Sequence, residues 1–335
     1  MATQTHRIRF PNFLTALLLA AVLPTINACE VLNSKHEHKR SLSDHPLVNQ
    51  IWDTREQKAV SRATLFQNAA NTRYVFIGET HDNESHHFIQ RELLNVLLAE
   101  GKHPALAMEQ FDIEHQSMIN HALLTANRSS ESIAEAGQFN HKGWNWSLYE
   151  PLVATAAQAN RPIVALNLSR KSAREIMTQG PEAVLGDTRV AQLALHSTWN
   201  STREDALQKE IVMGHCGHVP TGLLPKLTLA QRARDAFMAD ALLNVDSTNV
   251  VAVVGREHAR KDIGAPIYLA MRTPSASILS IGLIEIENER DKASDYFERN
   301  IAQRYDFVWF THPAMREDPC KGFSLPAAPS SGRGK

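Results

Sequence analysis

The chain has 335 residues, and 43% of them are hydrophobic, which is enough apolar material for one large core or two smaller ones. Its 35 Lys and Arg residues balance 36 Asp and Glu residues, so the chain lacks the basic surplus of a nucleic-acid-binding surface. Its 16 histidines are a modest sign of metal or porphyrin chemistry. We therefore expect a folded protein with no nucleic acid among its partners.

The first segment has the pattern of a secretion signal. Two arginines precede an apolar run over residues 13–23, which is too short for a bilayer that needs about 20 apolar residues. The run closes on Ile-Asn-Ala-Cys at 26–29, which resembles a bacterial lipobox. We predict a lipoprotein signal over 1–29 and lipidation of Cys29. Glu30, in place of aspartate, indicates the periplasmic face of the outer membrane. An ordinary signal peptide with a coincidental cysteine is the alternative.

Composition then divides the rest of the chain. Polar residues predict a flexible tether over 30–64, and a folded domain is expected over 65–315. A disordered tail, rich in Pro, Ser and Gly, is expected over 316–335. If lipid takes the first cysteine, Cys216 and Cys320 remain. They form neither a disulfide framework nor a zinc ribbon, but a single bridge stays open in an oxidising compartment.

Short apolar runs alternate with segments of helical period through the expected domain. The predicted strands are Tyr74–Gly78, Ala105–Met108, Ile163–Leu166, Val250–Val254, Ile278–Ile286 and Phe307–Phe310. The predicted helices lie near 84–100, 112–125, 148–160, 183–213 and 226–244. This alternation favours an α/β fold with a parallel or mixed central sheet and helices on both faces. Two long helical stretches before the fourth strand indicate a helical subdomain or lid over about 170–245.

Polar residues directly follow several predicted strands. In open α/β sheets, ligands bind beyond the carboxyl ends of the strands, so these residues should meet at one edge. They are Glu79 and His81, Glu109, Asn167, and Arg256 with His258. His, Glu and His are suitable ligands for a divalent metal with an open position. The same residues suit a metal-free site with a glutamate as general base. A third interpretation is that they only cap helices and strand ends.

Two further segments carry reactive residue types. The sequence His215-Cys216-Gly-His218 could bind metal, and Cys216 could be a nucleophile, although a tight loop is an equal alternative. Trp146 and Tyr149 belong to a dense aromatic patch. The tryptophan is typical of a core anchor at a helix start. A tyrosinate oxygen, by contrast, is a hard ligand that favours ferric haem iron, and aromatic walls suit a porphyrin.

Several of these motifs occur in a fixed order along the chain. They are Gly78–Asp82, Met108–Phe111, Trp146–Pro151, Ala165–Asn167, His215–His218 and Gly255–His258. Together they resemble the ChaN-type haem-binding lipoprotein family, part of the haem-uptake and Tiki superfamily. The resemblance covers roughly residues 65–312. No single motif is specific, but the ordered set is.

The resemblance implies an outer-membrane lipoprotein that binds haem and takes part in haem or iron uptake. It also implies a homodimer that shares haem and an outer-membrane haem receptor as a partner. In that family a tyrosine supplies the iron ligand, which we carry over to Tyr149, with Tyr74 and Tyr268 as the alternatives. The other residues expected to bind the cofactor are Trp146, His215 and His218.

The resemblance also leaves an enzyme open, because other members of the superfamily are metal-dependent proteases or esterases. The positions of this chain that match their metal ligands are His81, Glu109 and His258. A divalent ion there would lower the pKa of a bound water towards about 7. Glu79 would then be the general base, and Arg256 would stabilise developing negative charge. A metal-dependent hydrolase is therefore the alternative to a haem carrier.

Overall fold

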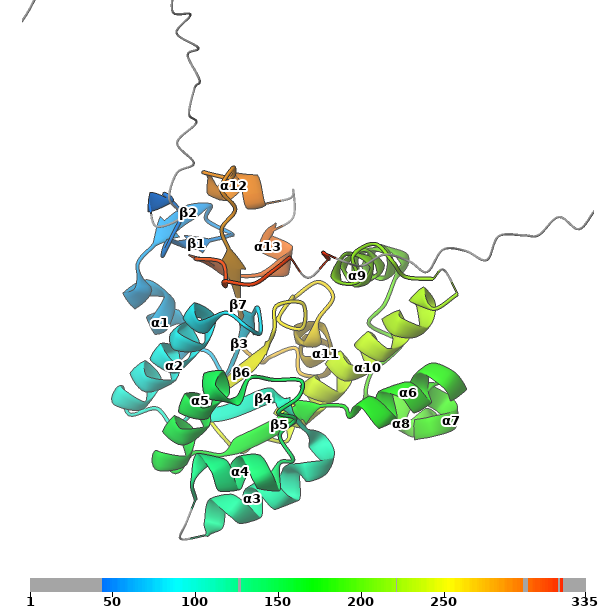
Figure 1. Cartoon of the computed structure of the whole chain (residues 1–335). Helices are drawn as coiled ribbons and strands as arrows, with labels where there is room; N and C mark the ends of the chain where they lie inside the picture. Colours follow the sequence, from blue (N-terminus) through cyan, green and yellow to red (C-terminus); the bar gives the residue numbers. More distant parts are fainter. Residues whose placement is uncertain (1–43, 126–127, 221, 298–300, 319, 322–335) are drawn as a thin grey trace, which may run out of the picture. The chain divides into compact units, whose positions relative to one another are not determined.

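The computed structural model describes residues 44–125, 128–220, 222–297, 301–318 and 320–321. Within them, one sheet has the strand order β2-β1-β8-β7-β3-β6-β4-β5 (Figure 1). The strands are β1 (Ile51–Asp53), β2 (Lys58–Val60), β3 (Tyr74–Glu79), β4 (Ala105–Asp112), β5 (Ile163–Asn167), β6 (Val250–Gly255), β7 (Ile278–Glu285) and β8 (Phe307–Thr311). From β8 to β5 neighbouring strands are parallel, and β1 is antiparallel to β2 and β8. The predicted α/β fold with a parallel or mixed sheet is confirmed.

Helices cover both faces of this sheet. One face carries α1 (Arg62–Ala70), α2 (Glu84–Ala99), α3 (Gln116–Leu124), α4 (Ser130–Ala136) and α5 (Trp146–Gln158). The other carries α6 (Arg170–Gln179), α7 (Pro181–Leu185), α8 (Asp187–Gln192), α10 (Leu224–Leu243) and α11 (Ala265–Arg272), with α9 (Ser201–Gly214) packed on α10. Two short helices, α12 (Ala293–Tyr296) and α13 (Ile301–Arg304), precede β8. None of the described helices is long and apolar enough to cross a membrane.

The pleat of each strand divides the interior into two cores. Successive side chains of a strand point to opposite faces of the sheet. In β3, Val75 and Ile77 pack in the core under α1–α5, whereas Tyr74 and Phe76 pack in the core under α6–α11. The same alternation carries the side chain of Glu79, at the end of β3, to the face of α1–α5. Strand register thus decides which helices can contact this carboxylate.

The predicted helix over 183–213 is wrong as a single element. Its residues fall in the end of α7, in α8 and in α9. Gly180 and Gly186, with φ of 87° and 78°, separate α6, α7 and α8. Glycine adopts these positive φ values without the steric cost that other residues have. The helices from α6 to α10 lie between β5 and β6, within the range expected for a helical subdomain.

The predicted tether over 30–64 is wrong from residue 45 onward, because His45 and Leu47 are already buried in the fold. Residues 51–60 form the β1–β2 hairpin, in which Ile51 is buried and pairs with Trp309 of β8. Strands of three residues are too short to show a periodic pattern, and the partner strand is distant in sequence. The predicted signal over 1–29, including the lipidation site Cys29, lies outside the described residues.

The predicted disordered tail over 316–335 is also wrong at its start. Arg316 forms ion pairs with Asp82 and Glu285. Cys320 forms a disulfide with Cys216 at the end of α9. In Figure 1 the segment after β8 runs towards α9. Composition alone does not predict this order, because it comes from contacts with distant parts of the chain. Residues 322–335 lie outside the described part.

Candidate functional site

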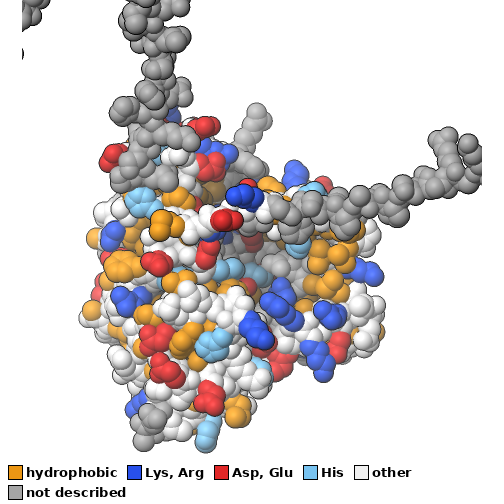
Figure 2. All heavy atoms as spheres, in the orientation of Figure 1, with side chains coloured by type: hydrophobic (Ala, Val, Ile, Leu, Met, Phe, Trp, Pro, Cys, Tyr) orange, Lys and Arg blue, Asp and Glu red, His pale blue; other side chains and the backbone are white. Residues whose placement is uncertain are grey.

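The carboxyl ends of β3, β6 and β4 lie side by side, because these strands are neighbours in the sheet. A cleft of about 550 Å³ opens there, and we refer to it as the edge cleft. In Figure 2 it lies near the middle of the face shown, with histidine side chains along it. Its lining includes Glu79, His81, Glu109, Arg256, His258 and, from α9, Met213. The structure therefore brings together the strand-end residues that the sequence pointed to, except Asn167, which donates to Asp112 at the β5 edge.

Glu79 is the centre of a buried hydrogen-bond network. Its Oε1 accepts from the Tyr149 hydroxyl at 2.6 Å and from the Gln110 amide at 3.3 Å. Its Oε2 accepts from the Gln90 amide at 2.6 Å. Burial alone would raise the pKa of Glu79, but His87, His81 and Tyr149 outweigh it and lower this pKa to about 2. Glu79 is therefore a fixed carboxylate and a weak base.

His81 is held by this carboxylate and by an aromatic ring. Its Nδ1 donates to Oε1 of Glu79 at 2.9 Å, and Trp144 meets its ring edge-on at 4.5 Å between centroids. Its side chain is 43% exposed, and its Nε2 makes no hydrogen bond to a described residue. Burial would lower the pKa of His81, but the hydrogen bond to Glu79 and the charge of Glu109 raise it.

Glycine at position 255 lets side chains approach the end of β6. A Cβ on Gly255 would lie 3.0 Å from Cε1 and 3.1 Å from Nε2 of His81, and 3.4 Å from Oε2 of Glu109. The backbone N–H of Gly255 donates to that Glu109 oxygen at 2.6 Å. Any larger residue would press on the His81 ring, which would have to shift by a few tenths of an ångström. This close approach explains why glycine stands at the strand end.

His258 is oriented by a second buried carboxylate. Its Nδ1 lies 2.7 Å from Asp235 of α10, and its Nε2 lies 3.5 Å from Glu109 and 3.1 Å from the Gln231 amide. Burial raises the pKa of Asp235 to about 6. Burial would lower the pKa of His258, but the charges of Asp235 and Glu109 raise it to about 9. The two side chains thus form an ion pair near neutral pH.

Several residues of these networks were missed from the sequence. They are His86, His87, Gln90, Gln110, Gln231 and Asp235. The ring of His86 binds Thr80 and Thr311, and burial lowers its pKa to about 3, so it is neutral. A signal was present: Gln90 and His86 share the apolar face of α2 at helical spacing. A polar residue on such a face needs a buried partner.

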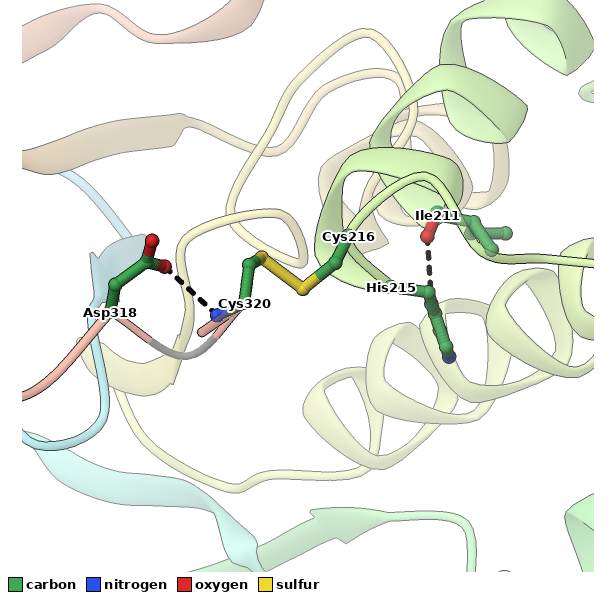
Figure 3. Close-up of a disulfide and its surroundings, with 5 residues drawn as sticks. All are labelled: Ile211, His215, Cys216, Asp318 and Cys320. Atoms are coloured by element: carbon green, nitrogen blue, oxygen red, sulfur yellow. Dashed lines mark hydrogen bonds between the residues drawn. A yellow bond between two sulfur atoms is a disulfide. The ribbon is translucent and has the colours of Figure 1, made fainter. Parts of the chain in front are cut away.

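The reactive residues that directly follow α9 do not line the edge cleft. Cys216 is bonded to Cys320, so it is not a free nucleophile, and Figure 3 shows this bridge. Nδ1 of His215 donates to the carbonyl of Ile211 in its own helix at 2.7 Å. In Figure 3 the His215 ring points away from the disulfide. Neither His215 nor His218 lines the cleft, so the structure does not bring these two predicted cofactor residues to it.

Tyr149 and Trp146, the two aromatic residues predicted to contact the cofactor, do not line the cleft. Tyr149 is fully buried, and its hydroxyl is engaged by Glu79. Burial, followed by the charge of Glu79, raises the pKa of Tyr149 above its ordinary value, which favours the neutral phenol. Trp146 packs against Phe139 at 4.7 Å and His141 at 6.2 Å between centroids, and it does not line the cleft.

The predicted metal centre has no support from the structure. Glu109 lies between His81 and His258, but the described residues contain no group of three or more His, Cys, Asp or Glu that could hold a metal ion. Arg256 lines the cleft with a side chain that is 40% exposed and pairs with Glu257 at 3.2 Å. Glu257 and Glu210 line the same cleft, so carboxylates outnumber the positive charges there.

Comparisons with known proteins agree with the sequence motifs. The family model described as haem-binding uptake, Tiki superfamily, ChaN matches residues 65–269. The solved structure of ChaN from Campylobacter jejuni with cofacial haem binding has a TM-score of 0.63 and 22% identity, over 78% of this chain and 95% of that one. A mutant of the erythromycin esterase EreC in its open conformation has a TM-score of 0.45 and 12% identity, over 77% of this chain and 94% of that one. The sequence matches no curated protein.

Proposed function

The chain belongs to the haem-binding uptake family of the Tiki superfamily, the ChaN family, and we propose that it binds haem in the edge cleft. The family match over residues 65–269 is the observation that carries this proposal. The matched range contains β3, β4 and β6, whose ends form the cleft, and the helix α9 that lines it. The site and the family assignment therefore rest on the same part of the chain.

The lining of the cleft combines four glutamates, two histidines and one arginine with one large apolar side chain, that of Met213. A volume of about 550 Å³ falls within the range of roughly 300–1,000 Å³ that is typical of cofactor pockets. The side chain of Met213, in a residue that is 63% exposed, offers an apolar wall. His81 offers an unbonded ring nitrogen, and Arg256 offers a positive charge for a carboxylate group of the porphyrin. Bound haem would supply the iron chemistry, and these residues would bind and orient it.

We further propose that the protein is an outer-membrane lipoprotein on the periplasmic face, active in haem or iron uptake together with an outer-membrane haem receptor. The lipobox-like sequence before Cys29 supports the lipid anchor. Two acyl signals suffice for stable membrane anchoring. The mass of the mature N-terminal peptide tests this part: a diacylated Cys29 supports it, and an unmodified residue at a different cleavage site contradicts it.

A homodimer that shares haem is the proposed assembly. It is supported by the Campylobacter jejuni ChaN structure, in which haem binding is cofacial. Sedimentation of the protein with and without ferric haem tests it. We expect monomers without haem and dimers at saturating haem. An unchanged sedimentation coefficient would contradict a shared site.

A titration with ferric haem, with metal analysis of the same preparation, tests the proposed function itself. Saturable binding, a shifted Soret band and little bound metal are the expected results. Arg256→Ala should weaken binding, whereas Arg290→Ala, outside the cleft, should leave the affinity unchanged. No saturable haem binding, with about one divalent ion per chain, would instead favour the metal-dependent hydrolase.

A further inference from the structure

We infer that the Cys216–Cys320 disulfide is a redox-sensitive link between two sides of the edge cleft, and that its reduction opens the cleft at α9. Residues 312–318 and Cys320 follow β8 and complete this link, and we call them the strap. The inference goes beyond the proposed haem function, because it does not depend on which ligand enters the cleft.

The strap is fixed at one end to the loop between β3 and α2. The side-chain amide of Asn83 donates to the carbonyl of His312 at 2.8 Å. Arg316 forms ion pairs with Asp82, in this loop, and with Glu285 of β7. The residue before Asp82 is a histidine that lines the cleft. This end of the strap is therefore anchored directly beside one side of the cleft.

The other end of the strap is fixed to the segment that follows α9. Cys320 is bonded to Cys216, as Figure 3 shows. Met213 and Gly214, at the end of α9, line the cleft and come just before the bonded cysteine. The strap therefore joins the β3–α2 loop to the end of α9, two parts of the cleft wall that are far apart in the sequence.

The end of α9 is weakly packed, so its position depends on this bond. Within α9, all of whose residues are described, only Leu207 is buried, whereas α10 has buried residues along most of its length. None of residues 211–220 is buried. The backbone N–H groups of residues 215–218 donate to carbonyls of residues 211–215, within the same segment. A segment with few buried contacts opens locally at a low cost in free energy unless a covalent bond restrains it.

The earlier part of α9 has attachments of its own. Glu210 pairs with Arg260, whose side chain is buried, and Glu204 pairs with Arg232 at 3.5 Å. These ion pairs do not involve the disulfide, so they persist when it is reduced. Reduction therefore releases the last turn of α9 and leaves the rest of the helix in place. The cleft then opens beside His258, which lines it together with this turn.

The disulfide lies where a reductant can reach it. Cys320 is exposed, and Cys216 is partly exposed. A dithiol attacks one sulfur as its thiolate, forms a mixed disulfide and is then oxidised to its own disulfide. Two electrons and two protons are transferred in total, and both cysteines become free thiols. A disulfide oxidant reverses the reaction, so the link can be broken and formed again.

Hydroxyl-radical footprinting read by mass spectrometry tests this link. We compare the wild-type protein, before and after treatment with a dithiol that is then removed, with Cys216→Ser/Cys320→Ser. The reporter is His258, whose side chain is 7% exposed, and the internal control is the fully buried His86 on α2. Reduction should speed oxidation of His258 about threefold or more and leave that of His86 unchanged. Reoxidation should restore the slow rate in the wild-type protein, and the serine variant should stay fast.

Arg316→Ala tests the other end of the strap while the disulfide stays intact. It should also speed oxidation of His258, by a smaller factor, because the contact of Asn83 with the strap remains. Arg290→Ala, at an exposed arginine with an ion pair outside the strap, is the matched control and should have no effect. Unchanged oxidation of His258 in the reduced protein, equal acceleration of His258 and His86, or no effect of Arg316→Ala would each overturn the inference. A protein that binds no haem would still give the expected results, so this inference and the proposed function fail separately.

Discussion

The two histidines of the edge cleft both have a carboxylate at Nδ1 and differ in what lies at Nε2. Nδ1 of His81 lies 2.9 Å from Glu79, and Nδ1 of His258 lies 2.7 Å from Asp235. The side chain of His81 is 43% exposed with an unbonded Nε2, whereas that of His258 is 7% exposed with Nε2 facing Glu109. A carboxylate at Nδ1 therefore orients both imidazole rings. Only His81 has an Nε2 without a hydrogen bond to a described residue, so we call His81 the open histidine and His258 the closed histidine.

The carboxylates behind these rings differ in the donors that surround them. Glu79, contacted from α2 and α5, accepts from Tyr149, Gln90 and His81. Against burial, the charge of His87 and the hydrogen bonds from His81 and Tyr149 lower its pKa to about 2. Asp235, on α10, is paired with His258, and burial raises its pKa to about 6. Favourable charges and hydrogen bonds offset the cost of burial only when there are enough of them. The carboxylate next to the open histidine therefore stays ionised to a lower pH than the carboxylate next to the closed one.

The largest expected effect comes from removing that anion. Glu79→Ala leaves the Tyr149 hydroxyl and the Gln90 amide buried without an acceptor, and it removes the partner of His81. We expect the free energy of unfolding to fall by about 3–5 kcal/mol. Denaturant titration measures this. Glu100→Ala, at an exposed glutamate, is the control and should change it by no more than about 0.5 kcal/mol. Similar values for both variants would show that the network does not stabilise the fold.

The next effect distinguishes the two sides of the cleft. The Cys216–Cys320 disulfide closes a sequence separation of 104 residues and holds the end of α9, which lines the cleft beside His258. The double variant Cys216→Ser/Cys320→Ser should lose about 2–4 kcal/mol of stability. Hydrogen exchange should become faster in α9 and stay unchanged in α2, which lies on the His81 side. The wild-type protein under reducing conditions should behave in the same way, and equal changes in both helices would contradict the prediction.

A smaller effect concerns the closed histidine and depends on pH. The pKa of His258 is raised from 6.5 to about 9, so the stability that its positive charge contributes is lost as the pH rises through 9. The pKa of Asp235 is about 6, so its carboxylate is protonated below that pH, and the ion pair is complete only between about pH 6 and pH 9. Asp235→Asn should lower the pKa of His258 and reduce stability at pH 7 by about 1–3 kcal/mol. Histidine resonances followed by NMR give the pKa. The exposed Asp246→Asn is the control, and an unchanged pKa in Asp235→Asn would refute the pairing.

The carboxylate next to His81 was among the predicted site residues, whereas the carboxylate next to His258 was not. Glu79, His81, Glu109 and His258 each follow an apolar strand closely, and a general rule on strand ends places them at one edge. Asp235 and Gln231 belong to a helix, and nothing local in the sequence shows which strand end that helix contacts. Partners of this kind are set by tertiary packing, so their identity required the structure.

The burial of Tyr149 and the disulfide connectivity could not be predicted from the sequence either. The aromatic patch around Tyr149 is visible in the sequence, but its pattern does not show that α5 turns the hydroxyl inward onto Glu79. The assignment of Tyr149 as the iron ligand came from the family resemblance, which does not show that Glu79 already engages this hydroxyl. The bridge between Cys216 and Cys320 joins segments that composition assigns to a loop and a disordered tail. Neither composition nor periodicity reports such long-range contacts.

The smallest expected effect tests whether the ring of the open histidine is held in place. Trp144 meets His81 edge-on, whereas Trp146 packs on Phe139 and His141 behind the cleft. An aromatic pair of this geometry contributes about 0.5–1.5 kcal/mol. Trp144→Leu should therefore speed haem release by about two- to tenfold, measured by transfer to an acceptor globin. Trp146→Leu should lower stability but leave the release rate unchanged, because it does not contact the ring. If Trp146→Leu released haem faster than Trp144→Leu, the packing of Trp146 on Phe139 and His141 would contribute more to haem retention than the orientation of His81.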